Sequence, residues 1–489
     1  MPALPRSPYF WVLFSTALVI LVAGLILGFF VQGWLAWILV AVYVGFDGWL
    51  LASSYAAARA AIQEEKEKER MAPGLSPIPD SPLPQPVSLS LVICARNERA
   101  ALPFMLETLQ KALRKTERAG EEIDIVVVDD GSTDGTGAWM RDHFMMRAAG
   151  GTASGTPVFV SRTWPGLRLL VRKGGGKAWA LNEGWRATAG EVVVTLDADT
   201  LVESGALEAL RASFSADPFL AVSGGVLTPQ CAPGTGWRGG LFQFFQTFEY
   251  LRSFLWRASW RRRGCLVLVS GAFGAYRRQA LAAVGGYDPG SLVEDYDIVY
   301  RIHRHSGEMG LGWKVGLCGA ARAVTDVPAR IAQFLRQRRR WFGGFLQVLF
   351  RNRDMAGKAQ YGTVGSYMIP LKAVDCLLPL YSLAASGVLV WFLATGRMWN
   401  PIILAILAGK FLYDATFHLL SARLWQRWQG DRGLLPGALL ATFTEPFFFQ
   451  LLRHFGALLG WVDFFRRRID WTPQRPVVAL GSVSANEGK

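Results

Sequence analysis

The stretch Val126-Val127-Val128-Asp129-Asp130-Gly131-Ser132-Thr133-Asp134-Gly135 decides the fold class. Its valines predict a buried strand, and the acids and the Gly/Ser turn mark where that strand ends. Further β-branched segments alternate with helical stretches from residue 88 to about 330, which predicts an α/β domain with a parallel sheet. Strands are expected at 89–94, 123–128, 169–171 and 192–196, and a small-residue loop at 150–155.

Two of these predicted strands end in paired acids. Ligands bind at the carboxyl ends of parallel strands, where Asp129 and Asp130 can accept hydrogen bonds from a nucleotide base or ribose. A turn with an Asp cap is the alternative. Asp197 and Asp199 flank one alanine, and two such carboxylates can hold a hard divalent cation that bridges a diphosphate. A solvated strand end is the alternative for that pair.

A third acidic motif is Leu292-Val293-Glu294-Asp295-Tyr296-Asp297. Sugar transfer with inversion needs a carboxylate to take the proton of the acceptor hydroxyl. Asp295 is the candidate base, and Glu294 is its neighbour. The alternative is a helix N-terminus enriched in acids, because residues 298–303 have a helical pattern.

Two basic segments complete the candidate site. In Gln337-Arg338-Arg339-Arg340-Trp341, arginine can bind a diphosphate bidentately and tryptophan can stack on a sugar. A juxtamembrane helix bound to anionic lipid is the alternative. Lys173-Gly174-Gly175-Gly176-Lys177 is a glycine loop between lysines, suited to phosphate, and a helix with Asn182 follows it. The Walker spacing is absent, which argues against an ATPase.

In this order, the motifs resemble the processive branch of glycosyltransferase family 2, which includes cellulose, hyaluronan, chitin-oligosaccharide and poly-N-acetylglucosamine synthases. The resemblance covers roughly residues 89–341 and the flanking membrane segments. It rests on Ala95-Arg96-Asn97-Glu98, Asp129-Asp130-Gly131-Ser132, Lys173 to Lys177, Asp197-Ala198-Asp199, Ser270-Gly271-Ala272-Phe273, Glu294-Asp295 and Gln337…Arg340-Trp341. Val293 and Asp326 replace the Thr and Glu common in the family, which leaves the subfamily open. The cellulose synthase gating-loop pattern does not follow Trp341, which counts against cellulose.

The resemblance implies a GT-A (Rossmann-like) fold, an inverting single displacement, a UDP-sugar donor and Mg²⁺ or Mn²⁺. Asp295 and Glu294 would be catalytic. Asp199, helped by Asp197, would bind the metal. Gly271, Gln337 and Trp341 would contact the acceptor. The donor would be bound by Ala95, Glu98, Asp129, Asp130, Lys177, Asp197 and Arg340, with Glu98 and Asp130 or Asp129 on the uridine.

The composition and the apolar runs indicate a membrane protein. Of 489 residues, 51% are hydrophobic and 18% charged, whereas soluble domains average about 25% charged. The runs 9–31 and 34–55, the second broken by Asp47, predict a transmembrane hairpin, since a span needs about 20 residues. A cleaved signal peptide is disfavoured, because the first run is too long.

Apolar character returns after Arg353, and spans are expected at 376–395 and 401–422. Segment 434–465 contains Glu445-Pro446 and ends in a basic cluster. A full crossing would place that cluster outside, against the positive-inside tendency, so a re-entrant or interfacial helix is expected.

Aromatic and charged residues near the spans give two further expectations. The aromatic-rich segment 242–260 is expected to be an amphipathic helix on the membrane surface; lining the mouth of an acceptor channel is the alternative. Lys410 and Asp414 are one helical turn apart and are expected to pair. Charged residues near spans, namely Asp47, Lys372, Asp375, Lys410 and Asp414, suit either a hydrated pore or structural pairs and snorkelling.

The net charge and the cysteine content limit which binding partners and which cysteine-based sites are expected. The net charge of +14 suits positive-inside flanks, anionic lipid or a nucleotide sugar. Nucleic acid is not expected, because no nucleic-acid fold signature accompanies the charge. The five scattered cysteines form no CxxC pair, which argues against a disulfide framework or a zinc site.

The predicted architecture is a cytosolic α/β GT-A glycosyltransferase domain embedded between α-helical transmembrane segments. It comprises an N-terminal hairpin (1–56), a charged then proline-rich linker (57–87), the catalytic domain (88–330), interfacial helices (331–358), C-terminal transmembrane or interfacial helices (359–470) and a cytoplasmic tail (471–489).

The expected function is hexosyl transfer from a UDP-sugar to a growing polysaccharide at a bacterial-type inner membrane, with secretion of the product. Transfer of one sugar to a lipid is the second hypothesis, and a non-catalytic transporter or scaffold is the third, which the complete set of acids disfavours. Expected partners are the donor, a glycan or lipid acceptor, membrane lipid, and export or regulatory subunits.

Overall fold

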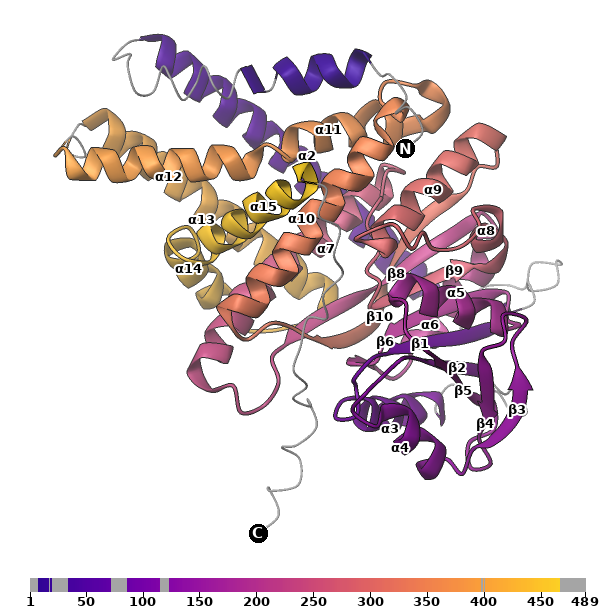
Figure 1. Cartoon of the computed structure of the whole chain (residues 1–489). Coiled ribbons are helices and arrows are strands. Elements are labelled where there is room, and N and C mark those ends of the chain that lie inside the picture. Colours follow the sequence, from indigo (N-terminus) through magenta and orange to yellow (C-terminus); the bar gives the residue numbers. More distant parts are fainter. Residues whose placement is uncertain are drawn as a thin grey trace. The chain divides into compact units, whose positions relative to one another are not determined.

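The computed structural model describes residues 8–16, 18–19, 34–71, 86–114, 123–396, 399 and 401–466. Most of the first predicted transmembrane run, the proline-rich part of the linker and the C-terminal tail lie outside them. The described chain (Figure 1) divides into two compact units. One holds residues 86–247 and 266–333, and the other holds 8–70, 248–265 and 334–466.

The first unit is built on a mixed 10-stranded sheet in the order β3-β4-β5-β2-β1-β6-β9-β8-β10-β7. Its centre, β5-β2-β1-β6, is parallel, as the sequence predicts, and β9 pairs antiparallel with β6. The strands are β1 (Leu89–Ala95), β2 (Asp124–Asp130), β3 (Arg147–Gly151), β4 (Pro157–Val160), β5 (Leu167–Arg172), β6 (Val192–Asp197), β7 (Thr200–Val202), β8 (Leu220–Gln230), β9 (Phe273–Arg277) and β10 (Lys314–Asp326).

The order of the strands fixes where the helices lie. The chain moves from β1 to β2 to β5 and then returns to place β6 on the other side of β1. Right-handed crossovers therefore put α3 and α4 on one face of the sheet and α5 on the other, as Figure 1 shows. Ligands bind in such sheets where the order reverses, here between β1 and β6. The helices of this unit are α3 (Leu102–Arg114), α4 (Thr136–His143), α5 (Lys177–Ala187), α6 (Ala206–Ala216), α8 (Arg278–Ala283) and α9 (Glu294–Met309).

The central strands are covered on both faces. Leu91, Val92 and Ile93 of β1 are fully buried. Strands covered on both faces consist of continuous apolar runs, which is why these strands can be predicted. The edge strand β3 replaces the first part of the loop expected at 150–155, and all its residues are exposed. Its small side chains bury nothing and so give no strand pattern.

The second unit is helical. Helices α7 and α10 have residues in both units. A 3₁₀ turn at Arg353–Met355, another at Ala359–Tyr361 and a π turn at Val364–Met368 precede the C-terminal helices. The helices are α2 (Trp34–Met71), α7 (Gly236–Arg262), α10 (Ile331–Arg351), α11 (Ile369–Asp375), α12 (Leu378–Ala394), α13 (Pro401–Gln429), α14 (Leu434–Thr444) and α15 (Phe449–Phe465).

One continuous stretch of the described chain, Val364–Ala394, is long and apolar enough to cross a membrane, with a mean hydropathy of 1.9 over an 18-residue window within it. It contains most of the span expected at 376–395. Helices α14 and α15 satisfy the same test only together, and they meet at 62°. The bend falls at the predicted Glu445-Pro446 interruption and suits a broken span or a re-entrant loop. The span expected at 401–422 is helical within α13 but does not satisfy this test in the described residues.

Several of the singled-out charged and aromatic residues have partners in the helical unit. Lys410 pairs with Asp414 as predicted, and Lys372 Nζ lies 2.8 Å from Asp375 Oδ2. The side chain of Asp47 lies outside the described residues. Phe254 of α7 is 1% exposed and contacts the Trp425 ring of α13. One side of α7 therefore packs against protein, and its place on a membrane surface stays a prediction.

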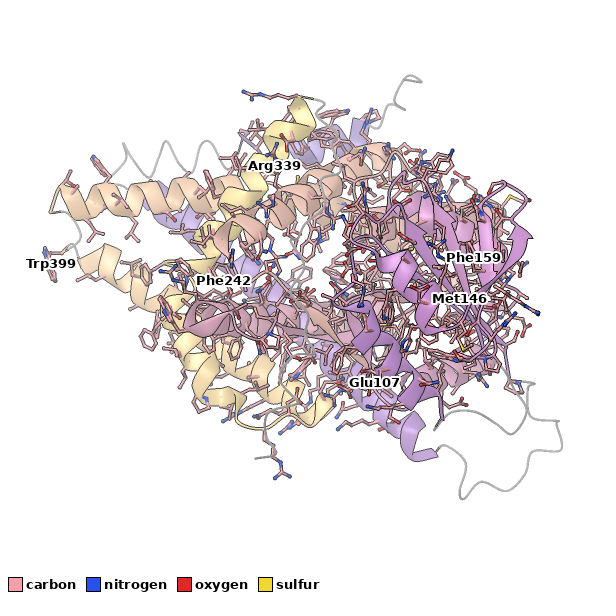
Figure 2. All side chains as sticks on the ribbon, turned by 60° about the horizontal axis from the view of Figure 1, so that its bottom comes forward. Glu107, Met146, Phe159, Phe242, Arg339 and Trp399 are labelled. Carbon is pink, nitrogen blue, oxygen red and sulfur yellow. The ribbon has the colours of Figure 1, made fainter. Side chains whose placement is uncertain are left out.

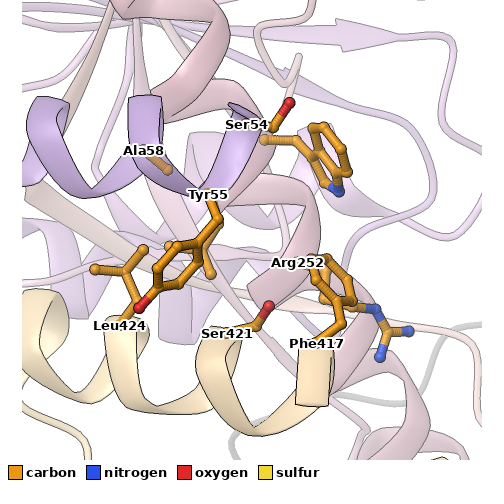
Figure 3. A pocket seen from close by; sticks show the side chains of 9 residues that line it. Ser54, Tyr55, Ala58, Arg252, Phe417, Ser421 and Leu424 are labelled. Carbon is orange, nitrogen blue, oxygen red and sulfur yellow. The ribbon is translucent and has the colours of Figure 1, made fainter. Parts of the chain in front are cut away.

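Helices α2, α7 and α13 also line a small, partly open pocket of about 20 Å³ (Figure 3). Tyr55, Trp256 and Leu424 contribute to its walls, one from each helix. Its volume suits a single water molecule, so these helices are closely packed.

Gly184 tests the packing of α5 on the sheet. A Cβ at this position would lie 2.3 Å from Val92 Cγ1. Ala normally stabilises a helix by up to about 1 kcal/mol over Gly, but overpacking costs about 1–3 kcal/mol. Gly184→Ala is therefore expected to lower the midpoint of thermal unfolding. The control Gly240→Ala in α7, where a Cβ meets nothing within 4 Å, should leave the midpoint unchanged or raise it. Equal behaviour of the two variants would contradict the described packing.

Candidate active site

The predicted acidic motifs lie at one edge of the sheet. The strand register places Ala95 opposite Asp129, and Cys94 opposite Asp197. Asp130 lies opposite Arg172 at the end of β5. The structure thus brings together the ends of β1, β2, β5 and β6, as expected for a ligand site at the switch point.

The loops after β1 and β2 are locked to each other. The Asn97 amide donates to Ser132 Oγ at 2.9 Å, and the Thr133 amide donates to Asn97 Oδ1 at 2.8 Å. The Glu98 amide donates to Thr136 Oγ1 at 3.1 Å. Asn97 has a φ of 59°, a region that Asn enters more readily than most residues. Glu98, a predicted uridine ligand, therefore stands on a rigid loop beside Asp129 and Asp130.

The two acids of β2 have different tasks. Asp129 Oδ1 accepts the Ser132 amide at 2.9 Å and so holds the turn. Asp130 pairs with the Arg172 guanidinium and accepts the Gly176 amide at 2.7 Å. Burial raises the pKa of Asp130, while the Gly176 hydrogen bond and Arg172 oppose that rise. Asp130 therefore joins the loop after β2 to the glycine loop after β5.

The glycine loop is held in place by its backbone. Gly174, Gly175 and Gly176 have φ values of +99°, +147° and +104°, which only glycine adopts readily. A Cβ on Gly131 would lie 2.8 Å from Gly174 N, so the two loops meet backbone to backbone. The Gly176 amide also donates to Asp130, so the loop is tied to β2 and places Lys177 at the start of α5.

Lys177 neutralises acids from two other elements. Its ammonium pairs with Asp197 and lies 3.5 Å from Glu294 Oε1. Burial lowers the pKa of Lys177, but Asp197, Glu294 and Asp295 outweigh this effect and raise it. Burial, opposed by Lys177 and assisted by Asp199, raises the pKa of Asp197 to about 6. Lys177, predicted to bind the donor, lies among the acids it balances.

The segment Ser270-Gly271-Ala272-Phe273 connects the second and third acidic motifs. The Asp197 amide donates to the Ala272 carbonyl at 3.3 Å, and the Gly271 amide donates to Asp295 Oδ2 at 2.8 Å. A Cβ on Gly271 would lie 3.0 Å from Asp295 Cβ. Gly271, predicted to contact the acceptor, is therefore the residue against which Asp295 rests.

The acids at the start of α9 are not equivalent. Asp295 is partly exposed, while Glu294 is 5% exposed beside Lys177. Asp295 Oδ1 also accepts the Tyr296 amide at 2.9 Å. Asp297 is buried and pairs with Arg301 at 2.7 Å. Asp295 is therefore the accessible carboxylate, as a base requires, whereas Glu294 is paired with the ammonium group of Lys177.

Asn182 positions α9 from a distance. Its Nδ2 donates to the Tyr287 carbonyl at 2.7 Å, and its Oδ1 accepts the Tyr287 amide at 2.9 Å. The side chain thus fixes the segment before α9 to α5, the helix that starts with Lys177.

The residues present fit a divalent cation. No group of three or more His, Cys, Asp or Glu side chains in the described chain forms a preformed metal site. Mg²⁺ bound with phosphates needs only one or two protein carboxylates. Asp197 and Asp199 flank the end of β6 and start of β7, and Thr200 Oγ1 lies 3.4 Å from Asp199 Oδ1. Two hard oxygen donors of this kind suit a cation that also binds a diphosphate.

The motif with Gln337, Arg340 and Trp341 lies on α10 in the helical unit. Within it, Arg338 is 1% exposed and pairs with Glu249 of α7, and its guanidinium lies 4.4 Å from the Trp341 ring centre. Arg338 is therefore buried in protein, and the lipid-bound alternative is wrong for this residue. Donor and acceptor contacts of Gln337, Arg340 and Trp341 stay predictions.

Two residues beside the acids were not predicted from the sequence. Cys94 at the end of β1 has its pKa raised by burial and by Asp197, against the effect of Lys177, so its thiol is protonated. Arg172 is the partner of Asp130. Arg172 is the last residue of β5 and directly precedes Lys173. Aligning the ends of the predicted strands would have placed it opposite Asp130.

Two family models and several characterised proteins are similar to parts of this chain. Residues 90–285 match "Glycosyl transferase family 2", and residues 192–415 match "Glycosyl transferase family group 2". A beta-monoglucosyldiacylglycerol synthase of Synechocystis sp. is 26% identical over 63% of this chain and 58% of its own. A poly-beta-1,6-N-acetyl-D-glucosamine synthase of Staphylococcus epidermidis is 26% identical over 55% of this chain and 60% of its own.

A solved structure has the same fold. It is a mannosyltransferase from Pyrobaculum calidifontis in complex with GDP-Man and Mn²⁺, with a TM-score of 0.50 and 18% identity over 86% of this chain and 100% of its own. The predicted GT-A-like α/β fold is confirmed by this likeness. The predicted place between transmembrane segments stays a proposal.

The class of protein follows from these findings. Models of glycosyltransferase family 2 match two overlapping parts of the chain, and the predicted resemblance to this family is confirmed. Both relatives are sugar-transferring synthases, which supports the prediction of a hexosyltransferase. The chain spans about three fifths of the length of these relatives.

Arg338 and Arg339 provide a matched test of the helix that carries Gln337 and Trp341. The Arg338–Glu249 pair is buried, whereas the Arg339 side chain is 46% exposed in its pair with Asp463. Breaking a buried pair costs about 3–5 kcal/mol, and breaking an exposed pair about 0–1 kcal/mol. Arg338→Gln should therefore lower the midpoint of thermal unfolding far more than Arg339→Gln. Similar midpoints would show that Arg338 is not buried against Glu249.

Proposed function

We propose that the protein transfers a hexose from a UDP-sugar to a growing polysaccharide, with inversion and with help from a divalent cation. The observation that carries the proposal is the link through segment 270–273, which joins Asp197 to Asp295 by backbone hydrogen bonds. A nucleotide-sugar site and an acceptor base must be adjacent for direct transfer. The matches to glycosyltransferase family 2 models agree with this chemistry.

The residues take the following roles in the proposal. Asp130 and Glu98 bind the uridine, and the sheet edge with Lys177 receives the diphosphate. A cation held by Asp199 and Asp197 would neutralise the charge of the leaving UDP. The acceptor hydroxyl attacks the anomeric carbon, the bond from that carbon to UDP breaks, and Asp295 takes the hydroxyl proton.

The surroundings of Asp295 and Glu294 support the assignment of different roles to these two carboxylates. Asp295 is accessible and held by two amides, so its oxygens are oriented for a proton. Glu294 is paired with Lys177 and acts as a positioning residue. Gln337, Arg340 and Trp341 are proposed to hold the diphosphate and the acceptor end.

The acceptor is proposed to be a glycan chain, in line with the Staphylococcus epidermidis relative. The apolar stretch Val364–Ala394 and the bent pair α14–α15 support a place in the inner membrane, with the catalytic domain in the cytoplasm and export of the product. Export or regulatory subunits are proposed partners. Transfer of one sugar to a lipid is the second candidate, because the Synechocystis relative forms a monoglucosyldiacylglycerol.

Product size separates the two candidates. The detergent-purified chain is offered a panel of UDP-sugars with Mg²⁺ or Mn²⁺, with and without diacylglycerol. A ladder of polymer is the expected product. A single glycolipid that requires diacylglycerol would select the second candidate, and no release of UDP from any donor would overturn the proposal.

Asp295→Asn removes the proposed base. Loss of a general base costs about 10²–10⁴-fold, so kcat for UDP release should fall by about that factor, while UDP binding by calorimetry stays near the parent value. The control is Glu308→Gln, an exposed carboxylate on the same helix, which should keep full turnover. An Asp295→Asn protein with parent kcat would remove Asp295 from the role of base.

Metal dependence is a separate prediction. Chelation with EDTA should abolish UDP release, and added Mn²⁺ or Mg²⁺ should restore it. Asp199→Asn should raise the metal concentration for half-maximal rate by about 10-fold or more, since even indirect metal partners contribute about 10–100-fold. Glu203→Gln, which removes an exposed carboxylate nearby, serves as the control. Full activity in EDTA would contradict the cation role.

A further inference from the structure

A groove between α3 and α4 is not used by the proposed reaction. It has a volume of about 670 Å³, within the range of about 300–1,000 Å³ typical of small-molecule sites. Its lining comes from α3, α4, the turns beside them and Trp164 of the loop between β4 and β5, all within the α/β unit. The acids Asp130, Asp197 and Asp295 are not part of this lining.

Aromatic rings form one side of the groove. The Trp139 and Phe144 ring centres are 5.9 Å apart, and so are those of Phe144 and Trp164. Phe144 and Trp164 are each 8% exposed, so both rings are fixed by packing, and Phe104 of α3 adds a further ring. These contacts make a connected aromatic platform rather than isolated surface rings.

Polar side chains surround this platform. His143 stacks on Trp139 with ring centres 5.0 Å apart, and the Arg99 guanidinium lies 5.1 Å from the centre of the Trp139 ring. Gln110 and Glu107 of α3 complete the lining. Glu107, labelled in Figure 2, also pairs with Lys111 at 2.6 Å. Arg99 and Glu107 balance each other, so the groove has no excess charge of either sign.

The lining selects a class of ligand. A phosphate-bearing ligand needs clustered cations, and the single guanidinium here is stacked on a ring. An acyl chain would bury the polar rim without hydrogen bonds, at a cost in free energy. Pyranose rings present apolar C–H surfaces for the exposed parts of the aromatic lining and hydroxyls for Gln110, Glu107 and His143. We propose that the groove binds a neutral oligosaccharide at a site separate from the active site.

The groove shares a loop with the proposed donor site. The Arg99 amide donates to Asp134 Oδ2 at 3.0 Å, in the locked pair of loops that also carries Glu98. A glycan bound here would be retained on the α/β unit next to the site where chains are extended.

Calorimetry on the full chain in detergent tests the proposal without donor or turnover. The probes are cellotetraose, tetra-N-acetylchitotetraose and maltotetraose. At least one should bind, and Trp139→Ala should weaken that binding by about tenfold or more, because a stacked indole is lost. Trp237→Ala is the control, since Trp237 is 74% exposed on α7, and it should bind as the parent does. UDP and Asp295→Asn should leave the binding unchanged.

The remaining outcomes each have a meaning. Gln110→Ala, a smaller change on the rim, should also weaken binding, so a folding defect of Trp139→Ala cannot decide the matter alone. The proposal is overturned if none of the three probes binds, or if UDP or Asp295→Asn abolishes the binding. It is also overturned if Trp139→Ala changes the mass by light scattering, which would make the groove an interface between copies. Binding without UDP release would uphold the groove while rejecting the proposed catalysis.

Discussion

The ammonium group of Lys177 lies against Asp197 of β6 and near Glu294 of α9, two carboxylates that are about a hundred residues apart in the chain. Without this cation, the acids of the second and third motifs would repel one another at the carboxyl edge of the sheet. Its position depends on the glycine loop, whose three residues have backbone angles that other residues rarely adopt. Charge balance at the site is therefore set by backbone geometry that precedes α5.

Backbone geometry also positions the acids in the surrounding loops. Asp130 accepts the Gly176 amide, and segment 270–273 hydrogen bonds to both Asp197 and Asp295. Backbone amides and carbonyls thus fix the acids, and few flexible side chains are needed to orient them. Such support leaves Asp295 partly exposed while its neighbour Glu294 is held by a cation. A site with fixed acids is suited to a highly charged substrate, because it reorganises little when charge arrives.

Much of the α/β unit could be predicted from the sequence because parallel strands buried on both faces are continuous apolar runs that end in polar turns. The clustering of Asp129, Asp130 and Asp197 followed from that rule, whereas Asp295, at the start of α9, was selected from its motif and the family resemblance. The pairing of Arg172 with Asp130 required the strand register, which no local pattern encodes. Strand β3 was missed because its exposed small residues give no period. The burial of Arg338 and of the α7 aromatics depends on distant helices, so local composition favoured a lipid surface instead.

The central claim is that acids distant in sequence converge on one nucleotide-sugar site. An anomalous difference map from crystals grown with UDP and Mn²⁺, collected at the manganese edge, tests it most directly. If these acids share one site, the map should contain a single strong peak beside Asp199 and Asp197, with UDP density extending from it toward Asp130. A manganese peak elsewhere, or UDP bound away from these carboxylates, would show that the acids do not form one nucleotide-sugar site.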